Sequence, residues 1–180
     1  VFDRDGRALA DAYETHEQRY PNPGWVEHDP VEIRENAKTV LTDALADAGV
    51  DAAALAAIGI ANQRETTLLW DAETGEPIHD AIVWQDRRTT DRIEAIERAG
   101  DDEWIRERTG LRPDAYFSAT KAEWLLDNAD AAADGNVGGD RDGPGDRDGP
   151  GGGDATVRER AEAGDLCLGT IDSWLVYALT

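Results

Sequence analysis

Residues 29–49 carry a complete set of helix signals, and this helix restricts the fold more than any other feature of the sequence. Asp29 can cap the first free amides, Pro30 has the fixed φ of a first helical position, and Glu32 follows in the first turn. The apolar residues share one helical face: Ile33, Ala37, Val40, Leu41, Ala44 and Leu45. The pattern predicts a helix that begins at Pro30 and ends at Gly49.

Short apolar runs before and after this helix predict strands. Residues 8–17 should extend a hairpin from the turn at Asp5-Gly6, and a turn is expected near Thr74-Gly75. The other predicted strands are residues 57–61, 68–70, 81–84 and 166–169. Helical patterns occupy residues 87–98, 102–108, 118–128 and 171–179. This mixture indicates an α/β protein.

The run Asn-Gln-Arg-Glu-Thr-Thr at residues 62–67 places an arginine beside a glutamate where a predicted strand ends. A guanidinium only donates hydrogen bonds and a carboxylate only accepts them, so together they can satisfy neighbouring hydroxyl groups of a small polyol. Adjacent strand residues point to opposite faces, so Arg64 and Glu65 can share a pocket only if the backbone turns or bulges there. The alternative is an exposed ion pair, which contributes little.

Several further stretches accompany this run in a recognisable order. They are residues 20–30 with Pro-Asn-Pro-Gly-Trp, residues 81–89 with Val-Trp-Gln-Asp-Arg-Arg, residues 109–121 ending Tyr-Phe-Ser-Ala-Thr-Lys, and residues 169–175. Together they closely resemble glycerol kinases of the FGGY carbohydrate kinase family, over nearly all of the chain except residues 130–154. The resemblance implies a ribonuclease H-like (actin-like ATPase) architecture, with residues 1–180 as an incomplete N-terminal domain.

The resemblance also implies roles for four residues. Arg64 and Glu65 would hydrogen-bond the glycerol hydroxyls, Trp84 would pack its ring along the carbon chain, and Tyr116 would offer its hydroxyl to the same substrate. An aromatic ring suits this task because it contacts C-H groups without demanding hydrogen bonds. The remaining tryptophans of apolar segments are expected in the core: Trp70, Trp104, Trp124 and Trp174.

Much of a kinase site is expected outside this chain. The sequence has no Walker A motif and no Gly-x-Gly-x-x-Gly run after a strand. By the resemblance, the phosphate-binding hairpin lies upstream of Val1, whereas the general base and most of the adenine site lie past Thr180. ATP and Mg²⁺ would therefore be bound mainly by parts absent here. No metal site is expected within the chain, because no other His or Cys lies at ligand spacing from His28.

The implied activity is transfer of the ATP γ-phosphoryl group to glycerol, giving sn-glycerol 3-phosphate. One alternative is another FGGY kinase that acts on a pentulose or a tetritol, and a second is a polyol-binding module without catalysis. The isolated chain is expected to be inactive, because half of a cleft between two domains cannot turn over substrate. The sequence leaves open whether the complete enzyme is a homo-oligomer.

The chain is strongly acidic, with 39 Asp and Glu against 18 Lys and Arg and a formal charge of -21. Only Lys38 and Lys121 are lysines. Like charges repel in dilute buffer, whereas molar salt shortens the Debye length to about 3 Å. Adaptation to high temperature usually enriches Lys together with Glu, and a GC-rich genome explains only part of the composition. We therefore expect a halophilic archaeal type of protein.

The same charge disfavours nucleic acid and anionic membranes as partners. No apolar run reaches the length of a membrane span, and nothing at the start resembles a signal peptide. The single cysteine, Cys167, rules out an internal disulfide and is expected to pack in the core. A cytoplasmic protein fits these observations.

Residues 130–154 interrupt the pattern with a repeated hexamer, Gly-Asp-Arg-Asp-Gly-Pro, and few apolar residues. Such a Gly/Asp/Pro-rich, low-complexity insert cannot bury enough surface to offset the entropy lost on ordering, so a disordered loop is expected. A calcium site is the alternative, but calcium loops need a fixed frame and a bidentate acid at their end, and two proline-broken hexamers do not supply these.

Overall fold

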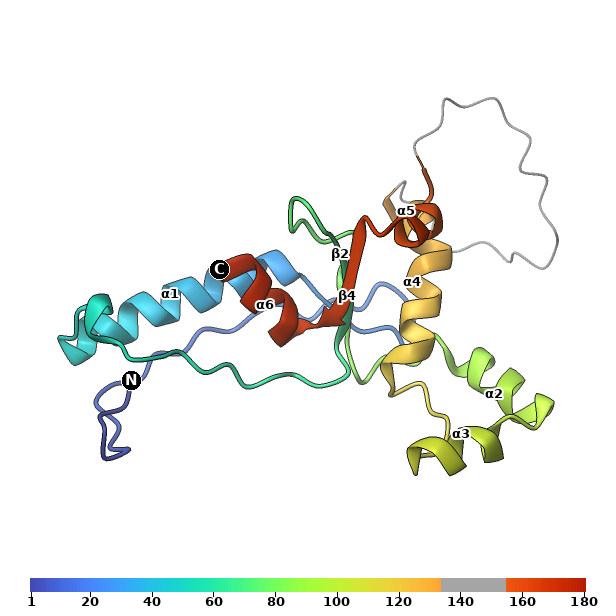
Figure 1. The fold of residues 1–180 in the computed structure, drawn as a ribbon, viewed down its shortest axis with the longest axis horizontal. Coiled ribbons are helices and arrows are strands. Elements are labelled where there is room, and N and C mark those ends of the chain that lie inside the picture. The colour runs from blue at the N-terminus through green and yellow to red at the C-terminus, as the bar shows by residue number, and fades with distance from the viewer. Residues whose placement is uncertain (134–154) are drawn as a thin grey trace.

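The structure is a computed structural model of the 180-residue chain, and it describes residues 1–133 and 155–180 (Figure 1). The strands are β1 (Glu27–His28), β2 (Thr67–Asp71), β3 (Ala81–Ile82) and β4 (Leu166–Thr170). The α-helices are α1 (Pro30–Ala48), α2 (Thr90–Ala99), α3 (Asp102–Thr109), α4 (Ser118–Ala133), α5 (Val157–Ala163) and α6 (Ile171–Leu179), and η1 (Ala52–Ala54) is a short 3-10 helix.

The four strands form one antiparallel sheet in the order β1-β3-β2-β4. β2 and β4 pair over five residues, with Leu69 opposite Leu168. Because side chains alternate along a strand, β2 sends Leu68 and Trp70 to one face and Leu69 to the other. Both faces of β2 are therefore buried, and the sheet is the middle of three layers.

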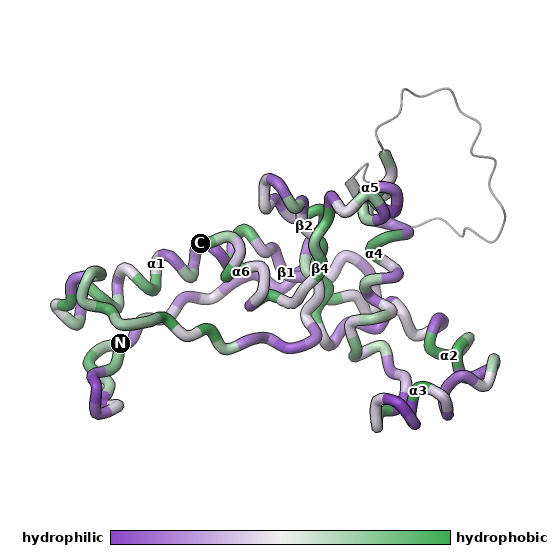
Figure 2. Tube along the Cα trace, in the orientation of Figure 1, coloured by the Kyte–Doolittle hydropathy of each residue, from purple (hydrophilic) through white to green (hydrophobic). Residues whose placement is uncertain are grey.

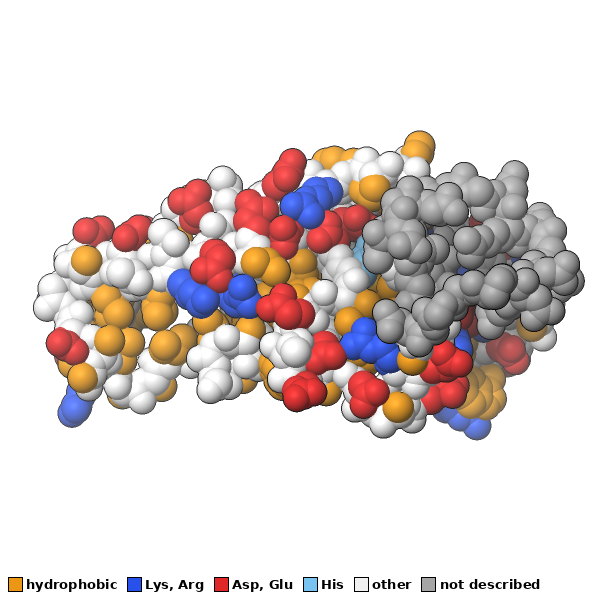
Figure 3. Space-filling model, turned by 90° about the horizontal axis from the view of Figure 1, so that it is seen from above, with side chains coloured by type: hydrophobic (Ala, Val, Ile, Leu, Met, Phe, Trp, Pro, Cys, Tyr) orange, Lys and Arg blue, Asp and Glu red, His pale blue; other side chains and the backbone are white. Residues whose placement is uncertain are grey.

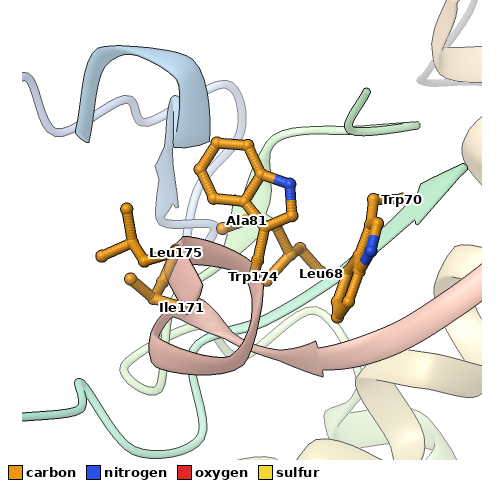
Figure 4. Close-up of a cluster of buried hydrophobic side chains, with 6 residues drawn as sticks. All are labelled: Leu68, Trp70, Ala81, Ile171, Trp174 and Leu175. Atoms are coloured by element: carbon orange, nitrogen blue, oxygen red, sulfur yellow. The ribbon is translucent and has the colours of Figure 1, made fainter. Parts of the chain in front are cut away.

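The first core lies between the sheet and α6 (Figure 4). Its buried members are Leu68, Trp70, Ala81, Ile171, Trp174 and Leu175. The indole of Trp174 is fully buried and donates to the carbonyl of Gly75 at 3.0 Å, which fixes the turn after β2. Ile33 and Ala37 bring α1 against the same cluster, and Cys167 packs beside it as expected.

The second core lies on the opposite face of the sheet, under α4 and α5. It contains Leu69, Ile82, Leu125, Ala129 and Val157. The hydropathy of the chain agrees with this arrangement, since β2 and β4 form the most continuous apolar stretch at the centre of the molecule (Figure 2). The start of α4 is thereby held close to the start of β2.

The predicted cap residues of α1 are confirmed. The Asp29 carboxylate accepts hydrogen bonds from the amides of Val31 at 2.8 Å and Glu32 at 3.3 Å. Gly49 ends the helix in the left-handed conformation, with φ 63°, and its amide bonds back to the last turn. Glycine accepts this conformation without the steric penalty that a Cβ would bring.

Two predicted strands are not formed. Residues 57–61 run as a coil from the far end of α1 back to β2, and Ile58 is 60% exposed (Figure 1). A strand needs a partner for its backbone groups, and in the described part of the chain no other strand lies beside this segment. Residues 8–17 are likewise irregular, and only the bridge between Phe2 and Ala8 remains of the predicted hairpin.

Three other expectations need correction or extension. Trp104 is 56% exposed rather than buried, because α3 has no buried residue and its indole stacks on Arg108 of the same helix. Helix α5 was not predicted, although Thr156 and Glu159 form a complete capping box at its start. Helix α4 continues to Ala133, into the predicted loop. The rest of the insert, residues 134–154, lies outside the described residues.

Acidic side chains are spread over the visible face in Figure 3 and outnumber the basic ones there. This distribution is what a formal charge of -21 requires, because so many carboxylates cannot be placed inside. Within residues 1–133 and 155–180, no helix is both long and apolar enough to cross a membrane.

Candidate functional site

The backbone turns at the Arg-Glu pair, as the sequence analysis required. The amide of Thr66 donates to the carbonyl of Gln63 at 3.3 Å, and β2 begins one residue later. Within this turn Glu65 has φ 63°, and it is the sole residue other than glycine with a positive φ in the described chain. A glutamate in the left-handed region is strained by about 1 to 3 kcal/mol, so other contacts must hold it there.

Ser118, the first residue of α4, holds the Glu65 carboxylate. The oxygen Oε2 accepts hydrogen bonds from the Ser118 amide at 2.9 Å and from its hydroxyl at 2.7 Å. A carboxylate is stabilised at a helix N-terminus, where amides are free and the dipole is positive. The second oxygen, Oε1, accepts no hydrogen bond from any described residue, so it can receive one from a bound hydroxyl.

Lys121 lies one turn further along α4 and is fully buried. Its ammonium group donates to the Glu65 carbonyl at 2.9 Å and to the Tyr116 carbonyl at 2.5 Å. Burial lowers the pKa of Lys121 to about 8, against the opposite pull of the Glu65 and Asp86 carboxylates. The amine therefore joins two loops from a position where its charge is poorly solvated.

Trp84 and Tyr116 form an aromatic wall. Their ring centroids lie 5.9 Å apart in an edge-on arrangement, and Phe117 packs against Tyr116 at 5.1 Å. Trp84 is 39% exposed, so one side of its ring is open. The wall borders an open pocket of about 590 Å³ lined by Trp84, Gln85, Arg87, Arg112, Asp114, Tyr116 and Phe117.

Of the four residues named from the sequence, three are linked in the structure. Trp84 contacts Tyr116 directly, and Lys121 ties the backbone of Tyr116 to that of Glu65. Arg64 is exposed on the turn, and its side chain makes no hydrogen bond or ion pair with the described residues. Neither Arg64 nor Glu65 lines the pocket beside the wall. Their role toward a ligand remains a prediction.

Behind Trp84 lies a buried charged cluster that sequence reasoning missed. Asp86 is 1% exposed and accepts hydrogen bonds from the Val26 amide at 2.7 Å and from the Arg88 side chain at 2.8 Å. Its own amide donates to the Val83 carbonyl at 3.0 Å, which closes the turn that carries Trp84. The run Asp86-Arg87-Arg88 was the available signal, but a sequence does not show whether such a pair is buried.

Arg88 completes this cluster. Its guanidinium is fully buried, pairs with Glu27 at 2.7 Å, and lies 3.9 Å from the ring centroid of Trp25 and 4.5 Å from that of Trp124. Cation–π contacts with two indole rings stabilise a desolvated guanidinium. Among the described residues, no three metal-ligating side chains lie close enough together to hold an ion.

The chain is a layered α/β domain in which Lys121 links the strained turn of Glu65 to the backbone of Tyr116. Comparison with known proteins specifies the class further. The sequence model of the FGGY family of carbohydrate kinases, N-terminal domain, matches residues 1–135. The chain belongs to this family, as the sequence analysis expected.

Curated relatives from halophilic archaea match the whole chain. A glycerol kinase of Haloferax volcanii is 59% identical over 180 residues, and one of Haloarcula marismortui is 58% identical over 180 residues. In each case the match covers 100% of this chain and 32% of the relative. The chain thus spans about a third of the length of the curated relatives it matches. Their source organisms agree with the halophilic type expected from the charge.

A solved structure supports the predicted fold. The crystal structure of Plasmodium falciparum glycerol kinase with ADP superposes with a TM-score of 0.74 and 30% identity, over 93% of this chain and 28% of that chain. The expected FGGY architecture is therefore confirmed at the level of the fold. The exposed residues 57–61 remain the main local difference from the prediction.

Proposed function

We propose that this chain supplies the glycerol site of an ATP-dependent glycerol kinase, in which the γ-phosphoryl group of ATP passes to glycerol to give sn-glycerol 3-phosphate. The observation that carries the proposal is the unused oxygen of Glu65. Ser118 and Lys121 hold the strained turn that carries this carboxylate, and Lys121 also donates to the carbonyl of Tyr116. Identities of 58% and 59% to glycerol kinases support the choice of glycerol.

The four predicted residues have complementary capacities toward a triol. Glu65 Oε1 can accept from one hydroxyl, and the five N-H groups of Arg64 can donate to hydroxyl oxygens. Tyr116 can offer its phenol, and the open side of Trp84 can cover the carbon chain. Within the described structure, Glu65 Oε2 is the one polar side-chain atom of these four residues that is hydrogen-bonded. The groups can therefore serve a ligand without breaking an existing bond.

The contribution of this chain to the reaction is binding and orientation. Holding one terminal hydroxyl in line with the transferred group replaces a bimolecular encounter by a positioned one. The proposed second substrate is ATP, in keeping with the ADP named for the Plasmodium structure. We propose that Mg²⁺, the nucleotide and the proton acceptor are held mainly by the part of the relatives' length that this chain does not span.

Substrate comparison tests the proposal. The full-length protein containing this chain is assayed for ATP-dependent phosphorylation of glycerol, xylulose and erythritol at equal concentrations in molar KCl. We expect kcat/KM for glycerol to exceed the others by about 100-fold or more, because a larger sugar leaves buried polar groups mispaired. A preference for xylulose or erythritol would assign a different FGGY substrate, and binding without any phosphorylation would indicate a non-catalytic module. Relatives named as glycerol kinases do not favour these two alternatives.

The 180-residue chain by itself is proposed to be inactive. It presents one wall of the site and contains no cluster of metal-ligating side chains in its described part. The check is a radiometric assay for glycerol phosphate with labelled ATP. Product formation above the level of a Glu65→Gln chain would refute the proposed inactivity.

A further inference from the structure

Lys121 occupies a position that packing does not explain. Lysine is among the residues least often fully buried, and here burial lowers the pKa of Lys121 to about 8. A methionine of similar length would fill the same space without placing a charge in the interior. The ammonium group must therefore make contacts that offset its desolvation.

Those contacts are two backbone carbonyls from separate segments. One belongs to Glu65, on the strained turn before β2, and the other to Tyr116, in the loop before α4. The same two residues carry the carboxylate and the phenol assigned to the substrate above. An ammonium group bonded to both carbonyls fixes the distance between the two backbones, which side-chain contacts alone would not do.

The turn at Glu65 gives the amine a specific task. A glutamate with φ 63° tends to relax toward the right-handed or extended regions, and its carbonyl would then rotate away from its present direction. Two groups donate hydrogen bonds to the Glu65 carbonyl. The bond from the Lys121 ammonium group, at 2.9 Å, is shorter than the bond from the Thr67 hydroxyl, at 3.3 Å. Losing the amine would release the turn and swing the carboxylate away from Ser118.

We propose that Lys121 is a positioning residue for the polyol site, acting as a clamp that holds the Glu65 turn and the Tyr116 loop in one geometry. The inference rests on the proposed function, because it takes Glu65 and Tyr116 as substrate residues. Lys121 touches no substrate in this arrangement. It acts through the backbones of the two residues that do.

The test compares Lys121→Met with Thr120→Val in the full-length protein. Thr120 is the matched control because it is the buried neighbour of Lys121 on α4. The change to valine removes its hydrogen bond to Thr89 at 2.9 Å, and its side chain is hydrogen-bonded to neither Glu65 nor Tyr116. We expect Lys121→Met to raise KM for glycerol by about 10-fold or more, with KM for ATP within about 3-fold, since two charged hydrogen bonds are lost at the polyol side alone. Thr120→Val should change KM for glycerol less than about 3-fold.

Several outcomes separate this inference from the proposed function. Wild-type protein that does not phosphorylate glycerol contradicts the proposed function, whatever the variant does. Wild-type activity with an unchanged KM for glycerol in folded Lys121→Met overturns the clamp, and so does an equal rise in both KM values. If Lys121→Met does not fold, Lys121→Gln keeps a shorter neutral donor and must raise KM for glycerol by about 3-fold or more. Failure of both variants to fold would show that Lys121 serves folding and would also overturn the proposal.

Discussion

Glu65 and Ser118 are joined by two hydrogen bonds, from the amide at 2.9 Å and from the hydroxyl at 2.7 Å, both to the same carboxylate oxygen. The first turn of α4 therefore orients the carboxylate that the family resemblance links to the substrate. The other oxygen, Oε1, has no hydrogen-bond partner in the described structure. The relationship explains why Glu65 can keep a backbone conformation that glutamate rarely adopts.

Ser118→Ala should weaken glycerol binding. The change removes the hydroxyl donor and leaves the amide, so one of two bonds to Glu65 Oε2 is lost. We expect KM for glycerol to rise by about 2- to 10-fold, the equivalent of about 0.5 to 1.5 kcal/mol, with kcat little changed. Steady-state kinetics of the full-length protein measure this. Ser173→Ala, near the start of α6, is the matched control, and an equal effect there would contradict the account.

Asp86→Ala should destabilise the domain strongly. The change leaves the buried Arg88 guanidinium with Glu27 alone and removes the acceptor of the Val26 amide. Breaking a buried pair in this way costs about 3 to 5 kcal/mol. Urea denaturation in molar KCl measures the unfolding free energy.

The control for Asp86→Ala is Glu123→Ala. Glu123 pairs with Arg92 at 2.7 Å, but both side chains are about half exposed. An exposed pair contributes about 1 kcal/mol or less, so this variant should unfold close to wild type. Equal losses in the two variants would show that burial of the Asp86 cluster is not what stabilises the turn at Trp84.

The stability of the protein should depend on Lys121 at alkaline pH. Its pKa is about 8 in the folded protein against an ordinary value of 10.5, so the unfolded state binds more protons between these pH values. Stability contributed through this group therefore rises with pH across that window, by up to about 1.4 kcal/mol per pH unit. The charged groups that face the amine are Glu65, Asp86, Arg88 and Asp114.

The measurement is the difference in unfolding free energy between wild type and Lys121→Met, from pH 7.5 to 10.5. The unfolding free energy of wild type should rise relative to that of Lys121→Met as the pH rises, because only wild type loses a buried charge on deprotonation. Lys38→Met, which changes an exposed lysine, provides the control and should show no such trend. A flat or falling difference for Lys121→Met would mean that the folded protein does not lower the pKa of the amine, and would contradict this prediction.

Salt should stabilise the fold. With a formal charge of -21, raising KCl from 0.1 M to 1 M shortens the Debye length from about 10 Å to about 3 Å and weakens repulsion among surface carboxylates. We expect the melting temperature followed by circular dichroism to rise by several degrees. Glu97→Lys with Glu107→Lys, on exposed positions of α2 and α3, should reduce that rise. A melting temperature independent of salt would contradict the halophilic interpretation.

Local signals predicted the elements that need only local chemistry. The cap at Asp29, Pro30 and Gly49 is sufficient to define α1, and a short apolar run is sufficient to predict β2. Residues 57–61 have the composition of a strand, but a strand depends on a neighbour that the sequence pattern does not specify. Helix α5 could have been found from its capping box at Thr156.

The site shows the same division. The family resemblance named Glu65, Trp84 and Tyr116, and the need for a turn at the Arg-Glu pair followed from strand geometry. The burial of Lys121 and the contacts of Arg88 with two indoles did not follow, because charged residues are normally exposed and long-range contacts decide these exceptions. The positive φ of Glu65 did not follow either, because glutamate rarely adopts it and the contacts with Ser118 and Lys121 come from a distant part of the chain.

The central claim is that the Glu65 carboxylate binds a hydroxyl of glycerol, and Glu65→Gln tests it most directly in the full-length protein. Glutamine has nearly the same shape but exchanges one acceptor oxygen for a donor. The account predicts a rise in KM for glycerol, or an equal fall in kcat/KM, of about 5- to 150-fold, the equivalent of about 1 to 3 kcal/mol for a charged hydrogen bond left unmade. Unchanged KM and kcat for glycerol in a folded Glu65→Gln protein would contradict it.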